Sequence, residues 1–123
     1  MWLCFNDGFY SIVAKPEGMT VRARSRKHLR AFLKHVPKDC KWAIKATPNA
    51  DYGFRVVLPA RVVATVIAQR VQDINYDNFK DSVEETRLHD MYALWWNDHY
   101  DYQNQKGAYT APTGNKQSKY HGY

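Results

Sequence analysis

The pattern of apolar and polar positions near the N-terminus predicts a pair of antiparallel strands. Apolar and aromatic residues dominate positions 2–5 and 9–14, and Asn6-Asp7-Gly8 separates the two runs. Asp and Gly both tolerate positive φ angles, so an Asp-Gly step between two such runs is typical of a hairpin turn. After a second turn at Pro16-Glu17-Gly18, residues 20–24 alternate small or apolar side chains with basic ones. This alternation predicts a third strand with one face in water.

Helical spacing begins after Ser25, which is suited to capping a helix. Residues 27–36 carry an apolar stripe at intervals of three and four, formed by Leu29, Phe32, Leu33 and Val36. This spacing predicts a first helix that ends before Pro37. Residues 42–46 and 53–58 then predict two more strands, because the segment between them is rich in the turn residues Pro, Asn and Asp.

Two more helices are expected in the second half of the chain. A second helix from Pro59 to about Asp73 carries an apolar stripe whose members are Val63, Val66, Ile67, either Arg70 or Val71, and Ile74. Asp77 is expected to cap a short helical segment. Residues 86–102 predict a third helix, with a stripe formed by Leu88, Met91, Tyr92, Trp95 and His99. Further aromatic residues on this helix cannot all reach one core, so some of them are expected to be exposed.

This order of elements predicts an α+β fold: an antiparallel sheet of about five strands with two to three helices packed mainly on one face. At 123 residues the chain fits one domain, which we place at residues 1–102. Residues 103–123 are polar and without periodicity, and they predict a flexible C-terminal tail.

Cysteine usage and hydropathy bear on the cellular setting. Cys4 and Cys40 both lie in apolar stretches and lack the spacing of metal ligands, so we expect two buried, reduced thiols. No apolar run approaches the roughly 20 residues of a membrane span, and the N-terminus lacks the features of a signal peptide. We therefore expect a cytoplasmic protein with no membrane association.

Charge is distributed unevenly along the chain, whose formal net charge is +6. Residues 1–45 hold ten basic and three acidic side chains, whereas residues 72–102 hold two basic and eight acidic ones. The basic block predicts one contiguous surface for the phosphates of a nucleic acid or another polyanion. Its expected binding residues are Arg22, Arg24, Arg26, Lys27, Arg30, Lys34, Lys41 and Lys45. The alternative is a basic face that only solvates the fold.

The acidic block offers a second hypothesis of a different class. Its carboxylates could imitate the charge of a nucleic acid, and its aromatic residues are of the types that anchor interfaces. We therefore consider an inhibitor or modulator that targets a host protein through residues 77–102. The expected interface residues are Asp90, Trp96, Asp98 and Tyr100. A solvated helix face is the simpler interpretation of the same pattern.

Catalytic and metal-binding patterns are weak. His89-Asp90 lacks the additional His and Asp of a metal phosphohydrolase, and His28 and His35 would stand about 10 Å apart on a helix. Glycine-rich nucleotide-binding motifs and nucleophile elbows are also missing from the sequence. We expect a binding protein with no catalytic residue, metal or cofactor. An enzyme whose site assembles only in three dimensions is the third hypothesis.

Five segments together resemble a group of small bacterial and phage proteins. They are Trp2-Leu3 through Asp7-Gly8-Phe9-Tyr10-Ser11-Ile12-Val13, Val21-Arg22-Ala23-Arg24, Ala50-Asp51-Tyr52-Gly53-Phe54-Arg55, Asn75-Tyr76-Asp77-Asn78-Phe79-Lys80 and Tyr92-Ala93-Leu94-Trp95. The resemblance covers residues 1 to about 100. It implies a single compact domain from bacteria or their viruses, and it carries over no activity and no catalytic residue.

Overall fold

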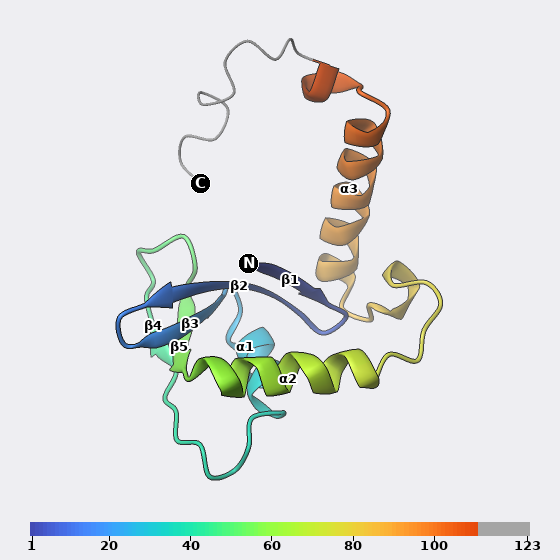
Figure 1. The fold of residues 1–123 in the computed structure, drawn as a ribbon. Coiled ribbons are helices and arrows are strands. Elements are labelled where there is room, and N and C mark those ends of the chain that lie inside the picture. The colour runs from blue at the N-terminus through green and yellow to red at the C-terminus, as the bar shows by residue number, and fades with distance from the viewer. Residues whose placement is uncertain (111–123) are drawn as a thin grey trace.

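The computed structural model describes residues 1–110, in which five antiparallel strands form one sheet with helices on both of its faces (Figure 1). The strands are β1 (Trp2–Phe5), β2 (Gly8–Lys15), β3 (Gly18–Ala23), β4 (Lys45–Ala46) and β5 (Phe54–Leu58). They lie in the order β1-β2-β3-β5-β4. The predicted α+β class and the predicted number of strands are therefore confirmed.

The two predicted turns join the first three strands. The β1–β2 hairpin closes where Phe5 pairs with Gly8. The β2–β3 turn ends at Gly18, whose φ of 141° is open to glycine but strained for other residues. A side chain at Gly18 would also crowd the carbonyl oxygen of Leu58. Glycine at this turn therefore lets β3 pair closely with β5.

The strand predicted at residues 42–46 is mostly wrong, because only Lys45 and Ala46 pair with β5. The preceding residues turn away from the sheet edge. Cys40 and Ile44 pack against the hydrophobic core instead, and the Cys40 amide bonds back to the Pro37 carbonyl. Burial of these two side chains draws the segment away from β5, so the ladder stays short.

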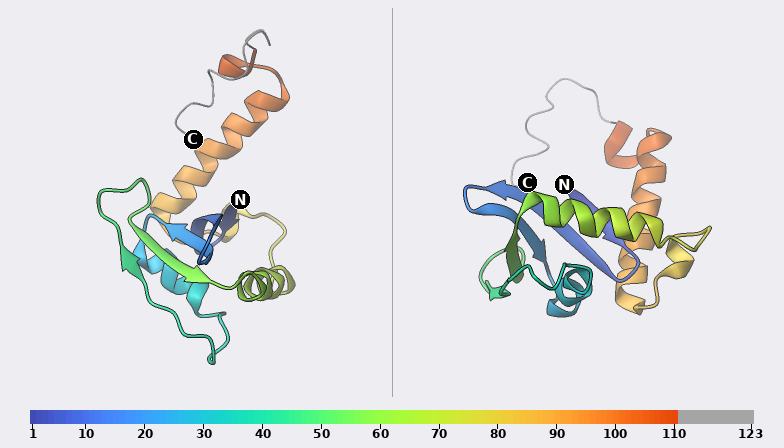
Figure 2. Two further views of the ribbon diagram at one scale, coloured as in Figure 1. Left: turned by 60° about the vertical axis from the view of Figure 1, so that its left-hand side comes forward. Right: turned by 60° about the horizontal axis from the view of Figure 1, so that its bottom comes forward.

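Helices α1 (Arg26–Leu33) and α2 (Ala60–Gln72) cover one face of the sheet (Figures 1 and 2). The core between them holds Tyr10, Ile12, Val21, Ala23, Leu29, Phe32, Leu33, Val36, Val56, Leu58, Val62, Val63 and Val66. The Ser25 hydroxyl caps α1 by accepting from the His28 amide at 3.4 Å. Regular helix ends at Leu33, earlier than predicted, and a tight turn then brings Val36 into the core.

Arg70 occupies the inward position of α2 for which the sequence offered Arg70 or Val71. Its Nη2 donates to Asp7 Oδ1 at 2.8 Å and to Asn6 Oδ1 at 3.3 Å. The guanidinium also lies 4.5 Å from the centre of the Phe5 ring. Val71 and Ile74, by contrast, are 60% and 50% exposed. Arg70 therefore links α2 to the β1–β2 turn. The predicted apolar stripe ends at Ile67.

Helix α3 (Thr86–Gln103) packs on the opposite face of the sheet, over the β1–β2 end (Figures 1 and 2). The smaller core beneath it holds Phe9, Tyr52, Val83, Leu88 and Tyr92. A 3-10 helix at Lys80–Ser82 precedes α3. Asn78 accepts from the Asp81 amide at the start of this turn, so the predicted Asp77 cap is wrong. Asn78 is the residue with the required offset of three positions.

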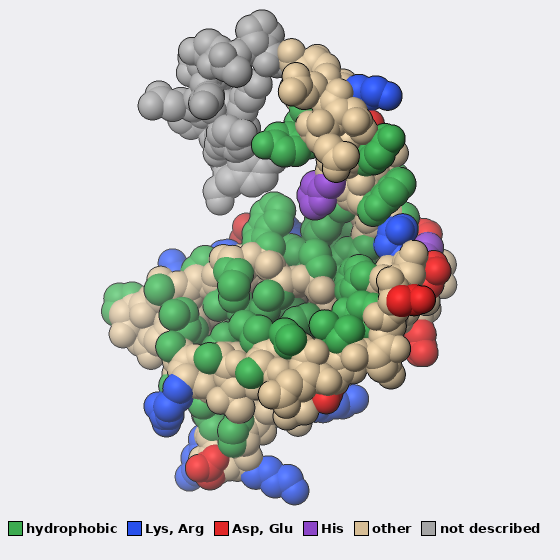
Figure 3. All heavy atoms as spheres, turned by 45° about the vertical axis from the view of Figure 1, so that its right-hand side comes forward, with side chains coloured by type: hydrophobic (Ala, Val, Ile, Leu, Met, Phe, Trp, Pro, Cys, Tyr) green, Lys and Arg blue, Asp and Glu red, His purple; other side chains and the backbone are tan. Residues whose placement is uncertain are grey.

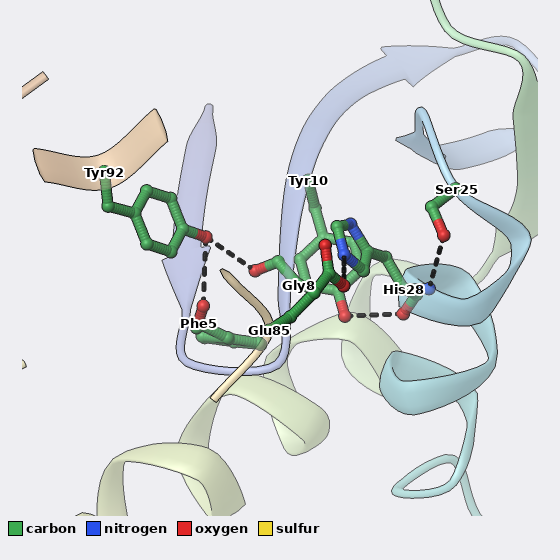
Figure 4. A network of polar contacts seen from close by, with 7 residues as sticks. All are labelled: Phe5, Gly8, Tyr10, Ser25, His28, Glu85 and Tyr92. Atoms are coloured by element: carbon green, nitrogen blue, oxygen red, sulfur yellow. Dashed lines mark hydrogen bonds and ion pairs between the residues drawn. The ribbon is translucent and has the colours of Figure 1, made fainter. Parts of the chain in front are cut away.

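A network of hydrogen bonds joins α3 and α1 to the first hairpin (Figure 4). The Tyr92 hydroxyl lies 2.9 Å from the Phe5 carbonyl oxygen and 3.0 Å from that of Gly8. The Tyr10 hydroxyl donates to the His28 carbonyl at 2.6 Å. A Cβ at Gly8 would overlap the Tyr10 hydroxyl. These hydrogen bonds fix the positions of α1 and α3 relative to the β1–β2 hairpin.

Both cysteines are free thiols, but neither is buried as predicted: Cys4 is exposed and Cys40 is half-buried. Cys4 alternates with Leu3 and Phe5 on β1, and it is those two side chains that pack against the core. Partial desolvation raises the pKa of the Cys4 thiol. This thiol is therefore mostly protonated at neutral pH.

The C-terminal end of the described chain follows α3 directly. A 3-10 turn at Gly107–Thr110 places Tyr109 edge-on against Tyr102, with 5.8 Å between the ring centres. The remainder of the predicted tail, residues 111–123, lies outside the described residues. Among residues 1–110, no helix is long and apolar enough to cross a bilayer.

Candidate functional site

A row of paired residues crosses all five strands on the face that α3 only partly covers. Trp2 pairs with Ser11, Ser11 with Arg22, Arg22 with Arg55, and Arg55 with Lys45. Directly paired residues point to the same side of a sheet. This side is opposite the α1 and α2 core, because the alternate residues Tyr10, Val21 and Val56 belong to that core. We call Arg22, Arg24, Lys45 and Arg55 the cationic sheet face.

Tyr52 organises the middle of this face. The guanidinium carbons of Arg22 and Arg24 lie 4.6 and 4.1 Å from the centre of its ring. The ring itself is 3% exposed and packs with Phe9 in the smaller core. Stacking on an aromatic ring holds a guanidinium group in place and leaves its charge intact. Arg22, in β3, and Arg24, directly after β3, are therefore fixed beside each other.

Hydroxyl groups fix the two arginines of the row. Arg22 Nη2 donates to Ser11 Oγ at 2.6 Å, and Arg55 Nε donates to Thr47 Oγ1 at 3.3 Å. Thr47 in turn donates to the Tyr52 carbonyl at 2.7 Å and closes the loop between β4 and β5. Arg22 Nε is buried without a hydrogen-bond partner among the described residues. These neutral contacts position the guanidinium groups and leave their charges uncompensated.

Among residues 1–110, no carboxylate lies within ion-pair distance of the cationic sheet face. Within residues 1–110, the basic groups that make ion pairs are His28, Arg70 and His89. Residues 111–123 contain no Asp or Glu. Four cations on one face that form no ion pair with a carboxylate of residues 1–110 create a local positive potential that attracts an anionic ligand.

The structure divides the predicted basic surface between two sides of the sheet. Arg22, Arg24 and Lys45 belong to the cationic sheet face. The remaining predicted residues lie on α1 and on the segment after it: Arg26, Lys27, Arg30, Lys34 and Lys41. Because α1 packs on the opposite side of the sheet, one flat ligand cannot contact both groups.

The outer side of α1 forms the second basic surface. Lys27, Arg30 and Lys34 are exposed and follow one helical stripe opposite the buried Leu29 and Phe32. These long side chains lack the aromatic and hydroxyl contacts of the cationic sheet face. Arg26 is the exception, because its guanidinium lies 4.8 Å from the centre of the Phe54 ring. The side chains of this surface are thus solvated and less preorganised.

The predicted protein interface on α3 does not form one face. Trp96 and Tyr100 stack with 5.8 Å between ring centres, and they are 54% and 48% exposed. Asp98 lies between them in sequence and two positions from each, so it points to the opposite side of the helix. Asp90 is exposed and contacts its neighbour His89 at 3.3 Å. Lys80 already lies over the Trp96 ring, at 4.8 Å.

Hydrophobic side chains gather between α2 and the first turns of α3 (Figure 3). A cavity of about 410 Å³ between β1, residues 77–80 and α3 is lined by residues that include Cys4, Phe79, Trp95, Trp96 and His99. His99 is exposed and lines the rim of this cavity. The exposed aromatic residues expected on the third helix are therefore present, mainly in its second half.

A second cavity, of about 380 Å³, lies next to Arg24 and holds the ionisable groups of His28, Glu85 and Arg87. His28 Nε2 and Glu85 Oε1 are 2.9 Å apart, so the two groups are engaged with each other. Among residues 1–110, no group of three or more His, Cys, Asp or Glu side chains is placed to bind a metal ion.

Comparisons with protein-family models, with curated proteins and with solved structures find no match to this chain. The resemblance to small bacterial and phage proteins therefore stays a prediction. Its quoted segments supply Ser11, Arg22, Arg24, Tyr52 and Arg55 to the same sheet face.

Four residues on this side of the sheet were not predicted from the sequence as site residues: Trp2, Ser11, Tyr52 and Arg55. Ser11 and Arg55 stand at alternate positions of predicted strands, which indicated that they could face away from the core. Their alignment with Arg22 depends on which strands become neighbours, and β3 and β5 pair across the intervening α1 and β4. Tyr52 lies in a predicted turn, where nothing indicates a buried ring.

Proposed function

We propose that this protein binds the phosphate backbone of nucleic acid through the cationic sheet face. The observation that carries the proposal is the pair of guanidinium groups of Arg22 and Arg24 over the Tyr52 ring. They form no ion pair with a carboxylate of the described residues, and they are aligned with Arg55 and Lys45. Arginine presents a planar set of donors that matches phosphate geometry. Binding is expected to be independent of base sequence, because backbone contacts carry no sequence information.

Preorganisation favours this surface over the outer side of α1. Holding a long basic side chain in one geometry costs conformational entropy when it is otherwise mobile. Before any ligand binds, Ser11 already restricts the side chain of Arg22, and Thr47 restricts that of Arg55. The Tyr52 ring restricts the side chain of Arg24. Each phosphate contact with these three arginines therefore retains more of its interaction free energy than a contact with Lys27 or Lys34.

The proposal also specifies the setting. A protein that binds a nucleic-acid backbone needs access to DNA or RNA, and the bacterial cytoplasm, including that of a virus-infected cell, offers both. The proposed activity is binding without catalysis. It requires neither a metal nor a cofactor.

Two charge-reversal variants test the proposal with matched controls. Arg24→Glu with Lys45→Glu changes the cationic sheet face, and Lys27→Glu with Arg30→Glu changes α1 by the same formal charge; all four residues are exposed. We expect the first variant to lower affinity for a mixed-sequence oligonucleotide about tenfold or more, and the second to have a clearly smaller effect. Fluorescence anisotropy at several salt concentrations measures both.

The salt dependence provides an independent reading of the same experiment. Four phosphate contacts predict a slope of log K against log salt of about −3, and the sheet-face variant is expected to lose about half of it. Thermal melting of both variants checks that they fold. Failure of the folded wild-type protein to bind, or equal losses in the two variants, would contradict the proposal.

A further inference from the structure

Trp2 places an exposed aromatic ring at one end of the row of paired residues that contains Ser11, Arg22, Arg55 and Lys45. It is 58% exposed although it belongs to β1 and pairs directly with Ser11. Its ring stacks on Trp95 of α3, with 6.1 Å between the ring centres and 15° between the planes, and it meets Phe9 edge-on. Trp95 and Phe9 therefore hold the indole in position, while more than half of the residue stays in water.

The spacing of the row matches an extended anionic polymer with flat side groups. Neighbouring strands lie about 4.8 Å apart, which puts Arg22 about 10 Å and Lys45 about 19 Å from Trp2 along the row. An indole at one end and three cations beyond it, at Arg22, Arg55 and Lys45, follow one line across the sheet. Stacking on aromatic rings combined with cationic contacts to the backbone is the usual way in which proteins hold single strands.

We propose that the cationic sheet face selects single-stranded over duplex nucleic acid, with one base stacked on Trp2 and the following phosphates at Arg22, Arg55 and Lys45. This inference rests on the proposed function and adds the class of nucleic acid. Bases in a duplex are stacked on each other and cannot reach the indole. A duplex would gain only the charge contacts, whereas a single strand gains both.

Binding of equal-length oligonucleotides tests the inference. The wild-type protein is titrated with a fluorescent single strand of mixed sequence, with the corresponding duplex, and with polyglutamate of the same net charge. We expect the single strand to bind most tightly. Replacing Trp2 by Ala is expected to weaken single-strand binding about 5- to 150-fold and to change duplex binding little.

Two further variants make the test specific to Trp2. Trp2→Phe keeps an aromatic ring and is expected to retain part of the preference, so it serves if the Ala variant melts too early. Trp42→Ala is the matched control: Trp42 is 43% exposed, but its neighbours Cys40 and Ile44 pack on the α1 and α2 side. We expect it to bind like wild type.

The outcomes separate this inference from the proposed function. Equal binding of single strand and duplex, or unchanged single-strand binding by Trp2→Ala, overturns the inference and leaves backbone binding standing. Polyglutamate binding as tight as that of the single strand overturns it in favour of an acidic protein surface. Absence of binding to either nucleic acid overturns both.

Discussion

Two buried tyrosines show how single residues stabilise the surroundings of the site. Tyr10 is fully buried and Tyr92 is 4% exposed, and each hydroxyl contacts backbone carbonyl oxygen. Burial raises the pKa of both hydroxyls well above the tyrosine value of about 10. For Tyr92 the nearby Cys4 raises the pKa further, and for Tyr10 the carboxylate of Asp7 does so. The fold therefore requires both groups in their neutral form.

Alkaline pH is expected to destabilise the protein through these residues. Above pH 10 the unfolded chain releases both protons, whereas the folded chain keeps them. The free energy of unfolding therefore falls by about 1.4 kcal/mol per pH unit for each group, and this stability is fully present below pH 9. Urea unfolding of wild type, Tyr10→Phe and Tyr92→Phe between pH 8 and 12 measures it. Slopes that are the same in all three proteins would contradict the assignment.

At the residue scale, the sequence identified charges but not their partners. Arg22 and Arg24 were predicted to bind anions because they belong to a dense basic run. That Arg22 contacts Ser11 and Tyr52 follows from tertiary packing of segments far apart in the chain. The predicted burial of Cys4 was also wrong, because apolar neighbours in the sequence do not determine which side of an edge strand packs against the core.

At the scale of elements, the apolar spacing predicted all three helices because each buries a continuous stripe. Their ends and the β4 strand were less predictable. Residues 34–36 of the expected first helix form a turn, and residues 42–44 leave the sheet edge to bury Ile44. Both deviations arise from packing against a core that no local pattern specifies.

The contact between His28 of α1 and Glu85 before α3 is expected to stabilise the arrangement of these two helices. Glu85→Ala removes the 2.9 Å contact to the buried His28 and should lower the free energy of unfolding by about 1–2 kcal/mol. Glu84→Ala is the control, because Glu84 is exposed and should change it by less than about 0.5 kcal/mol. Thermal or urea unfolding compares them. Equal effects would show that this contact does not join the helices.

At the scale of the whole molecule, the sheet separates two basic surfaces that are continuous in sequence. Arg24 and Arg26 are two residues apart, yet one stacks on Tyr52 and the other on Phe54, which belongs with the opposite core. The class of fold was predictable because alternation and helical spacing are local signals. The site was predictable only in part, because its row depends on strand order and on the chain reversing direction around α1.

Chemical-shift mapping tests most directly whether the cationic sheet face binds the nucleic-acid backbone. In ¹⁵N-labelled protein titrated with a short mixed-sequence single strand, we expect the largest changes at residues 20–24 and 52–55 and at the Trp2 indole, Arg side-chain Nε–H signals included. Helix α1 and residues 96–103 of α3 should change little. Changes confined to α1, or to the α3 residues Trp96 and Tyr100, would contradict binding at the sheet face, as would a spectrum that the oligonucleotide leaves unchanged.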